Sequence, residues 1–398
     1  MPSPIPLGVR SAARRPGLLL SLVLILGASF GLIAAAVAII DSFVFRSLPF
    51  PDGGRLVWLK SRHGDSLLGV SHADYLDWAA ATRTTFQGLA IFNGDFYAVV
   101  SGTDLPAESI LVTRSVSSLF PVLGIQPLLG RTPTPAEDQP DAQAVALVGE
   151  GLWRRHFGRD PGVLGRTVTI DGLPHVIIGV MPQAFRFPSR SEIWVSTAAW
   201  NNLWPHREVR VDSVVGRLLP GVSLLQGRQA LAVVSEHLAR EYPDSNAGIT
   251  TNVERLRDVW AGDTQGLSML ALMASAALLV VVMVNASGLF AVRLTDQLRP
   301  TAIRQALGMG PWRSLAAPLV EGLLVGLAGS AVALAVAALA LRIARRWMFA
   351  DLPAWMDTEL SVGVAALTVL GTALAGLILA LPSALAARVL LATNPLSV

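Results

Sequence analysis

No cysteine occurs among the 398 residues, which excludes a disulfide, a thiolate zinc site, an iron–sulfur cluster and a thiol nucleophile. Lysine is almost absent too, since the only one is Lys60, which follows Leu59. The phosphate-binding loop GxxxxGK[ST] needs a lysine directly after a glycine, so these residues contain no such loop. The six histidines show no HExxH and no other metal-ligand spacing, so we expect no metal and no cofactor: His63, His72, His156, His175, His206 and His237.

Charge is scarce throughout the chain. Only 15% of the residues are charged, whereas 52% are hydrophobic, and the mean hydropathy is +0.53. A soluble domain carries more charge and less apolar surface. The formal net charge of +3 is small and dispersed, which argues against a nucleic-acid surface. The composition therefore indicates a membrane protein.

Four apolar runs are long enough to cross a bilayer, which takes about 20 residues. The first, from Leu18 to Ile40, has 23 residues without a charge, and the others cover about 267–292, 314–341 and 361–387. A cleaved signal peptide, cut near Ala34 to Ala36, is the alternative for the first run, but its apolar region would be only about 7–15 residues long. We predict a multi-pass α-helical membrane protein with four transmembrane helices.

The distribution of arginine predicts the topology. Residues 1–17 carry Arg10, Arg14 and Arg15, which the positive-inside rule keeps in the cytoplasm. Residues 41–265 are then exported, and four spans return both termini to the cytoplasm. The loop after the second span agrees, because it carries Arg293, Arg299, Arg304 and Arg313. Three arginines disagree, because they fall at the outer end of the third span: Arg342, Arg345 and Arg346.

The exported block of about 220 residues is the only part with a globular composition, and it is large enough to bury a core. We expect a strand over 55–60, then a helix that Ser71 and Asp74 cap and that carries Tyr75, Trp78 and Phe86. Further along the chain, 145–148 predicts a buried strand, and 167–170 and 175–180 a hairpin around Asp171-Gly172.

A second capping box in this block, Ser223 with Gln226, starts a helix that Tyr242-Pro243 ends. Strands and helices mix without regular alternation, so the predicted class of the exported block is α+β.

Small residues recur in the apolar runs at a spacing of four. Gly27 and Gly31 match GxSxG, but a nucleophile elbow needs a strand, a turn and a helix rather than the middle of a span. We read them as a GxxxG packing motif, which Gly322 and Gly326 repeat in the third span. These glycines are expected to pack helices closely, either within one chain or between chains. We expect no catalytic residue.

Two polar residues lie inside predicted spans. Asn285 begins a formal glycosylation sequon, but its position favours a helix-to-helix hydrogen bond. Glu321 would cost about 2.5 kcal/mol or more as an ion in lipid, so it should face protein or water. A buried polar contact and a proton or substrate role both remain open for it. Outside the membrane, Glu137, Asp138 and Asp141 lie in a Pro-rich loop that we read as a solvated turn.

The loop after the second span contains a short helix in its sequence. Pro300 can start it, and Gly308, Gly310 and Pro311 can end it, so 300–307 reads as about two turns. Two turns bury too little surface to be stable alone in water. Four residues share one face that must lie on lipid headgroups or on a second protein: Ala302, Ile303, Ala306 and Leu307.

Several stretches together resemble the MacB-like and FtsX-like permeases of ABC transporters, especially the orphan permease branch. They run in the order of the family and cover almost the whole chain. They are Leu48-Pro49-Phe50-Pro51, 71–78, Phe86-Gln87-Gly88-Leu89, FPVLGIQPLLGR at 120–131, GLWRRHFGRDPGVLGR at 151–166, Asp171-Gly172, 178–182, 215–218, 220–222 and AIRQALG at 302–308.

The resemblance implies one span, a large extracytoplasmic domain, an inserted lobe of about 106–199 within it, and a permease domain over 266–398. In this family the loop after the second span contacts a separate ABC ATPase, here through Arg299, Ala302, Ile303, Arg304, Ala306 and Leu307. The chain would then be a permease subunit in the bacterial inner membrane, with no enzymatic activity of its own. Its partners would be that ATPase, membrane lipids and a second permease unit, but no nucleic acid.

Two departures from the family pattern bear on that reading. An acidic residue usually follows the arginine that corresponds to Arg299, whereas this chain has Pro300. The chain is also predicted to be a single four-span unit, whereas in the orphan permease branch that it resembles two such units are often fused. Three functions follow: export or extraction of an amphipathic substrate, FtsX-type regulation without transport, and a receptor or inert remnant.

The topology predicts that a cysteine introduced in the exported block reacts with a membrane-impermeant reagent on intact cells. The chain has no native cysteine, so Ser61→Cys would be the only reactive site. Labelling of that cysteine only after the cytoplasm is opened would contradict the topology.

Overall fold

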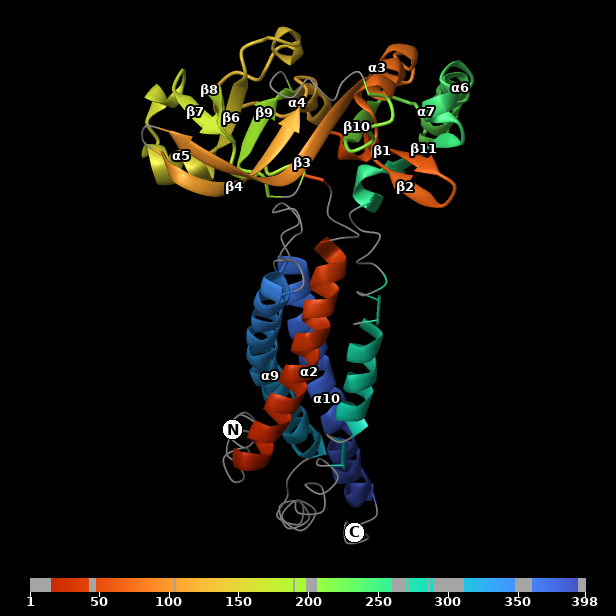
Figure 1. The fold of residues 1–398 in the computed structure, drawn as a ribbon. Coiled ribbons are helices and arrows are strands. Elements are labelled where there is room, and N and C mark those ends of the chain that lie inside the picture. Colours follow the sequence, from red (N-terminus) through yellow and green to blue (C-terminus); the bar gives the residue numbers. More distant parts are fainter. Residues whose placement is uncertain are drawn as a thin grey trace. The chain divides into compact units, whose positions relative to one another are not determined.

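The chain forms two compact units in a computed structural model (Figure 1). The membrane unit comprises Met1–Phe45, Thr264–Ala350 and Thr358–Val398, and the globular unit comprises Arg46–Asp263 and Asp351–Asp357. The structure describes residues 16–42, 48–102, 105–188, 190–197, 206–259, 266, 269–270, 272–284, 287–288, 311–347 and 360–392.

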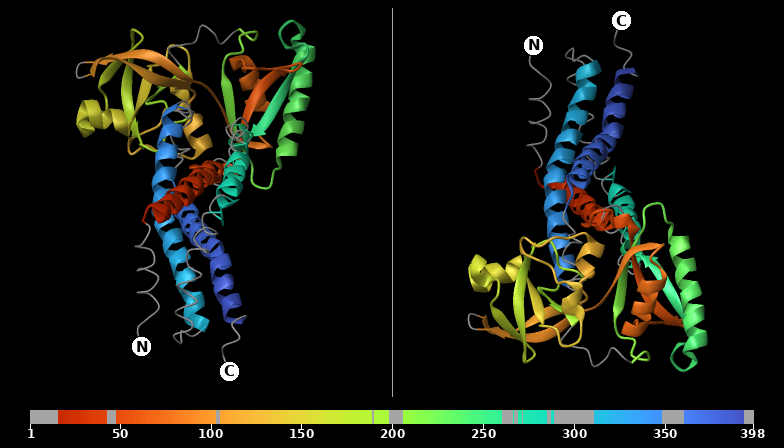
Figure 2. Two further views of the ribbon diagram at one scale, coloured as in Figure 1. Left: turned by 90° about the horizontal axis from the view of Figure 1, so that it is seen from below. Right: turned by 90° about the horizontal axis from the view of Figure 1, so that it is seen from above.

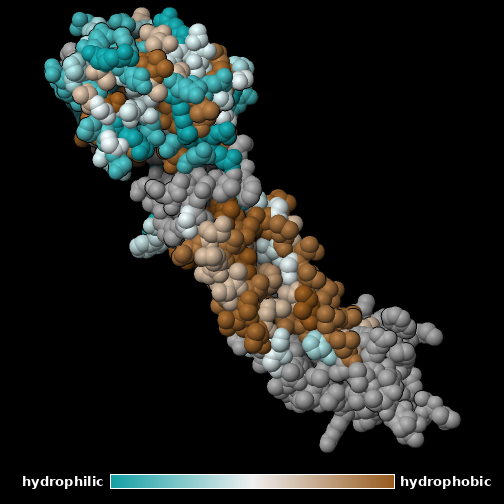
Figure 3. Space-filling model, turned by 90° about the vertical axis from the view of Figure 1, so that its right-hand side faces the viewer, coloured by the Kyte–Doolittle hydropathy of each residue, from teal (hydrophilic) through white to brown (hydrophobic). Residues whose placement is uncertain are grey.

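The membrane unit contains three described helices that are long and apolar enough to cross a bilayer: α2 (Pro16–Ile40), α9 (Pro311–Trp347) and α10 (Val362–Ala392). Of the predicted second span, the structure describes the apolar helix Leu272–Val284. The exposed side chains of these helices are largely hydrophobic (Figure 3), as lipid contact requires. The predicted class of a multi-pass helical membrane protein is confirmed.

The third span is longer than the sequence predicts, and this bears on the three discordant arginines. We expected an end at 341, but α9 continues to Trp347, so Arg342, Arg345 and Arg346 lie on its last turns. A cation there is favoured by the negative end of the helix dipole. These arginines therefore have a local structural reason that is independent of the sidedness rule.

The globular unit is built on one mixed sheet that helices α3, α4 and α6 accompany (Figures 1 and 2). Its strand order is β11-β1-β10-β3-β4-β9-β6-β8-β5, with β2 beside β1, and β7 beside both β3 and β8. The strands are β1 (Leu56–His63), β2 (Ser66–Leu68), β3 (Phe86–Gly102), β4 (Leu105–Ser115), β5 (Leu129–Gly130), β6 (Val145–Gly149), β7 (Thr167–Ile170), β8 (Leu173–Met181), β9 (Ile193–Ser196), β10 (Ser213–Leu218) and β11 (Ile249–Arg255). The helices are α3 (His72–Ala81), α4 (Leu119–Leu123), α5 (Glu150–Phe157), α6 (Leu224–Glu241) and α7 (Pro243–Asn246).

Six of these strands close into a barrel. β3 pairs with β4, β4 with β9, β9 with β6, β6 with β8, β8 with β7, and β7 returns to β3. The interior is an apolar cluster to which every strand of the ring contributes, for example Val100, Val112, Val148 and Ile177. Closure removes the exposed edges that an open sheet would present.

A second apolar core lies outside the barrel and includes Trp78 of α3, Leu119 of α4 and Leu231 of α6. β6 and β9 serve both cores, because Leu147 and Trp194 face this core while their neighbours face the barrel. Burial on both faces explains why 145–148 is a continuous apolar run. The predicted lobe boundary near 106 falls in the β3–β4 hairpin, which contributes to both cores, so the lobe division itself stays a prediction.

The local predictions in this unit mostly agree with the structure. Ser71 caps α3 by accepting a hydrogen bond from the Asp74 backbone, and Ser223 and Gln226 form the capping box of α6. β7 and β8 form the predicted hairpin, in which Asp171 and Gly172 both have positive φ.

One local prediction and one experimental design are corrected. We expected Phe86 on the α3 helix, but that helix ends at Ala81, and Phe86 is the first residue of β3. β-sheet pairing with Leu218 of β10 overrides the helical spacing. Ser61 is fully buried, so the exposed Ser66 is the better cysteine position for labelling from outside.

Two buried histidines make the globular unit sensitive to acid. Burial lowers the pKa of His72 to about 4, an effect that Asp212 opposes and Arg114 assists, and burial also lowers the pKa of His175. In the unfolded chain both titrate near 6.5, so below that pH the unfolded state binds more protons than the folded state. Stability is therefore lost as the pH falls from about 6.5 towards 4.

We expect His72 alone to lower the free energy of unfolding by about 2 kcal/mol between pH 7.5 and pH 5. Urea titrations of the purified chain, followed by tryptophan fluorescence at the two pH values, measure this. His72→Gln should reduce the pH dependence by that amount. An identical pH dependence in wild type and His72→Gln would contradict the assignment.

Candidate functional site

The predicted ATPase-contacting residues cannot be placed in this structure. Arg299, Ala302, Ile303, Arg304, Ala306 and Leu307 lie outside the described residues, as does the intramembrane Asn285. The candidate sites that the structure does describe are the contacts between the membrane helices, a buried ion-pair network in the globular unit, and two cavities there.

The first two predicted packing glycines lie on the side of α2 that faces α9. A Cβ atom at Gly27 would stand 2.5 Å from the Val332 Cβ, and one at Gly31 would stand 2.7 Å from the Ala333 carbonyl oxygen. Real Cβ atoms do not approach so closely, so only glycine permits this helix separation. The two helices lie side by side (Figure 1).

The other two packing glycines lie on the side of α9 that faces α10. A Cβ at Gly326 would stand 2.5 Å from the Thr372 carbonyl oxygen, and one at Gly322 would stand 2.6 Å from the Ala380 Cβ. The contact is reciprocal, because Gly376 of α10 lies against Gly322 and Gly326. Sequence reasoning missed Gly376, although Thr372, Gly376 and Ala380 repeat the spacing of four that marks small-residue packing.

Glu321 precedes Gly322 on α9 and is 5% exposed. Its carboxyl group is therefore inside the membrane unit rather than in lipid, as the cost of an exposed charge in a bilayer demands. That position fits both a buried polar contact and a proton or substrate role.

The buried carboxylate of Asp74 connects three segments of the globular unit. Asp74 on α3 is 1% exposed, and its Oδ1 accepts from Arg207 Nη1 at 2.6 Å and from Asn246 Nδ2 at 3.0 Å. Arg210 Nη1 donates to Oδ2 and Arg210 Nη2 to the Ser245 carbonyl oxygen at 3.1 Å. The network ties residues 207–210 and α7 to α3. Because removing one partner of a buried ion pair leaves a charge without compensation, we read this ion-pair network as a structural link between these segments.

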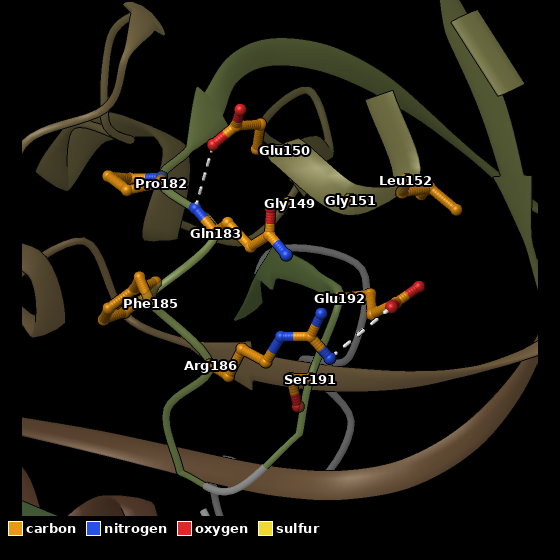
Figure 4. A pocket seen from close by; sticks show the side chains of 10 residues that line it. All are labelled: Gly149, Glu150, Gly151, Leu152, Pro182, Gln183, Phe185, Arg186, Ser191 and Glu192. Atoms are coloured by element: carbon orange, nitrogen blue, oxygen red, sulfur yellow. Dashed lines mark hydrogen bonds and ion pairs between the residues drawn. The ribbon is translucent and has the colours of Figure 1, made fainter. Parts of the chain in front are cut away.

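A small cavity beside α5 is lined by charged side chains that already have partners (Figure 4). Glu150 accepts from the Gln183 backbone N–H at 3.3 Å, and Arg186 Nη1 lies 3.7 Å from Glu192 Oε1. Arg159 and Arg155 pair with Glu150 and Glu192 at 2.7 Å and 2.5 Å. The cavity of about 10 Å³ holds about one water molecule. It is too small for a substrate.

A larger groove of about 680 Å³ runs between α3 and the start of β3, and its lining includes Leu76, Arg83 and Phe86.

We expected the acidic loop at 137–141 to be a solvated turn, but two of its acidic side chains have partners in the protein. Asp138 accepts hydrogen bonds from the Ser117 backbone N–H at 2.9 Å and from Ser117 Oγ at 2.6 Å, and Glu137 pairs with Arg131 at 2.6 Å. Burial raises the pKa of Asp138.

Known protein families match both the globular unit and the membrane helices of this chain. A sequence model described as MacB-like periplasmic core domain matches residues 19–243, more than half of the chain, and one described as FtsX-like permease C-terminal matches residues 272–395. The chain belongs to the MacB-like and FtsX-like permease family. Its globular unit is thus a periplasmic core domain, and its resemblance to the family, read from the sequence, is confirmed.

The MacB-like permease is similar to several longer bacterial proteins. It is 27% identical over 268 residues to the macrolide export ATP-binding/permease protein MacB of Burkholderia thailandensis, covering 65% of this chain and 38% of that protein. It is 25% identical over 288 residues to a probable export ATP-binding/permease protein of Pseudomonas fluorescens, covering 68% of this chain and 43% of that protein. The chain thus spans less than half the length of these relatives.

Two solved structures of bacterial permease domains align with about half of the chain. The periplasmic region of MacB from Actinobacillus actinomycetemcomitans aligns with a TM-score of 0.40 at 13% identity, covering 52% of this chain and 91% of that one. A domain of a putative permease from Porphyromonas gingivalis aligns with a TM-score of 0.41 at 16% identity, covering 52% of this chain and 92% of that one.

The glycine contacts predict which substitutions the membrane unit tolerates. Gly326→Ala should lower the thermal stability of the permease in detergent, because the new methyl group meets the backbone of α10, which cannot yield as a flexible side chain can. A loss of about 1–3 kcal/mol is expected. Gly17→Ala is the matched control on α2, since nothing lies within 4 Å of its Cβ position. Equal melting temperatures for the two variants would contradict the packing.

Proposed function

We propose that the chain is the permease subunit of an ABC transporter complex. A separate ATPase hydrolyses ATP, and the permease converts that cycle into movement of its periplasmic domain, which exports or extracts a substrate. The observation that carries this proposal is the order of the two family matches, a periplasmic core domain over residues 19–243 followed by a permease domain over residues 272–395.

The 398 residues lack the loop that a phosphate-loop ATPase needs. No GxxxxGK[ST] loop occurs in the 398 residues, so nucleotide hydrolysis by a phosphate-loop ATPase must come from residues outside them. The matched relatives are named as ATP-binding/permease proteins and are more than twice as long as the part that aligns. We propose an ATPase that is a partner subunit in trans, as the resemblance to the permease family implies.

The membrane arrangement follows from the arginines and the spans. We propose a multi-pass protein of the bacterial inner membrane with both termini in the cytoplasm and residues 41–265 in the periplasm. A pair of ATPases acts on two sides, so a second permease unit, a copy or a paralogue, completes the assembly. The packing glycines do not support that pairing, because Gly27, Gly31, Gly322 and Gly326 all contact helices of the same chain.

The cytoplasmic loop is the proposed site of coupling. The face formed by Ala302, Ile303, Ala306 and Leu307 has the pattern of a helix that docks in a groove, where a few anchors carry most of the binding energy. Arg299 and Arg304 lie on the same segment and can form screened ion pairs at its rim, which are worth about 0–1 kcal/mol.

The FtsX-like match over residues 272–395 favours a second function of the same parts. In it, the ATPase cycle moves the periplasmic domain to regulate an exported partner, and nothing is transported. ATP-dependent efflux or lipid extraction by reconstituted complex supports the first function, whereas ATP-dependent activation of a bound periplasmic protein supports the second.

The coupling proposal predicts the effect of substitutions in the loop. Leu307→Asp should lower recovery of the ATPase with the permease by roughly tenfold or more, because a carboxylate would be desolvated without a partner. Ile303→Ala should lower it less, and Arg304→Ala least. The measurement is co-purification from native membranes, with the ATPase recognised by its GxxxxGK[ST] peptide.

Gln305→Ala is the control, because helical spacing predicts Gln305 off the apolar face. Membrane yield of each variant separates a docking defect from an insertion defect. Normal yield with unchanged ATPase recovery for Leu307→Asp would remove this helix from coupling and would point to Pro300 as the mark of a lost contact.

A further inference from the structure

The last turns of α9 carry two exposed arginines on one side of the helix. Arg342 and Arg346 are four residues apart, so their side chains are neighbours on the helix surface. Neither forms an ion pair with another residue that the structure describes. Like charges at this spacing destabilise a helix, and the helix dipole supplies only about half a negative charge at this end. An excess of positive charge therefore remains at the end of α9.

These arginines lie at the depth of the lipid headgroups. The membrane-spanning part of α9, Pro318–Trp347, has 30 residues and is about 45 Å long, whereas the hydrocarbon core of a bilayer is about 30 Å thick. The uncharged stretch 322–341 alone covers about 30 Å. Leu341 ends this stretch, and it is the last residue of α9 that is buried in the core shared with α2 and α10. The depth of the arginines thus follows from α9 itself.

The side of α9 that carries the arginines continues into the hydrocarbon with small side chains. Ala335 and Ala338 are exposed and lie seven and four residues before Arg342, which places them on the same side of the helix. Their methyl groups let a hydrocarbon chain approach the backbone closely.

Large exposed side chains border this row of alanines. Leu339, Ile343 and Trp347 follow one another at a spacing of four, which forms a ridge along the helix, and Trp347 is 79% exposed. Tryptophan is enriched at the level of the headgroups, because its ring is apolar and its N–H is polar. The end of α9 therefore presents cations, an aromatic ring and a low apolar surface together.

We propose that Arg342 and Arg346 bind the phosphate of an anionic phospholipid, one acyl chain of which lies over Ala335 and Ala338. The planar guanidinium group presents two parallel N–H groups to phosphate oxygens. An anionic lipid is favoured over a zwitterionic one, because an ammonium group in the headgroup would return a positive charge to the two arginines.

A lipid accounts for both parts of this surface, whereas free phosphate would contact only the arginines. The inference depends neither on an ATPase partner nor on which face of the membrane this end of α9 reaches.

The test compares the full-length permease, purified in detergent and stripped of lipid, with two double variants. Arg342→Gln/Arg346→Gln removes both cations but keeps good helix formers, and it should lower the retention of phosphatidylglycerol about tenfold or more. Arg154→Gln/Arg240→Gln is the charge-matched control, because both arginines are exposed in the globular unit. It should retain the lipid as wild type does.

Three probes separate the possible ligands. Phosphatidylglycerol and phosphatidylethanolamine are added in equal amounts and counted by native mass spectrometry, and inorganic phosphate is titrated against thermal unfolding. Preferential retention of phosphatidylglycerol by wild type and control, and its loss in Arg342→Gln/Arg346→Gln, supports the site.

Three results would overturn the proposal: equal retention of the two lipids by wild type, equal retention of phosphatidylglycerol by wild type and Arg342→Gln/Arg346→Gln, or stabilisation by free phosphate without selectivity between the lipids. The first comparison needs no variant, so it decides even where a double variant fails to fold.

Discussion

The periplasmic core domain depends on one unbroken strand. β3 runs for 17 residues, pairs with β10 at its start and with β4 and β7 at its end, and contributes Phe86 to one apolar core and Val100 to the other. Its hydrogen bonds therefore hold the barrel and the helix-covered part of the sheet together. Because β3 joins the two apolar cores, the cores should move together when the domain moves. The register shift between Asn93 and Phe96 is the place where β3 could bend and let them move separately. Transmission of motion benefits from such a connection, because a packed interior deforms little.

The close approach of its helices limits the side-chain volume that the membrane unit can hold at their contacts. α9 contacts α2 through Gly27 and Gly31 on one side and α10 through Gly322, Gly326 and Gly376 on the other. In lipid, where there is no hydrophobic drive between helices, backbone proximity supplies the packing energy. The three described spans thus form a set that tolerates little added volume along α9, while the second predicted span is described only over 272–284.

Sequence reasoning recovered those features that local chemistry determines. Uncharged runs gave the membrane helices, Ser71 and Ser223 gave helix starts, and Asp171-Gly172 gave a hairpin, because each depends on a few adjacent residues. Phe86 was misplaced because pairing with a strand more than 100 residues away outweighed its helical spacing. The contacts of Asp74 with Arg207 and Arg210 were missed for the same reason, since they join residues 133 and 136 positions apart. The barrel follows from pairings between distant strands, which periodicity cannot register.

The central claim is that nucleotide turnover by a separate ATPase moves the periplasmic core domain. Because the chain has no cysteine, a spin label at Ser66→Cys marks one exposed position in each permease unit. The direct measurement is the distance between the labels of paired units in the ATPase complex, without nucleotide and with ATP trapped by a hydrolysis-deficient ATPase. The account predicts distance distributions that differ between the two states by more than the width of the label's rotamers. The same distribution in both states, with the ATPase bound and nucleotide occupied, would contradict it.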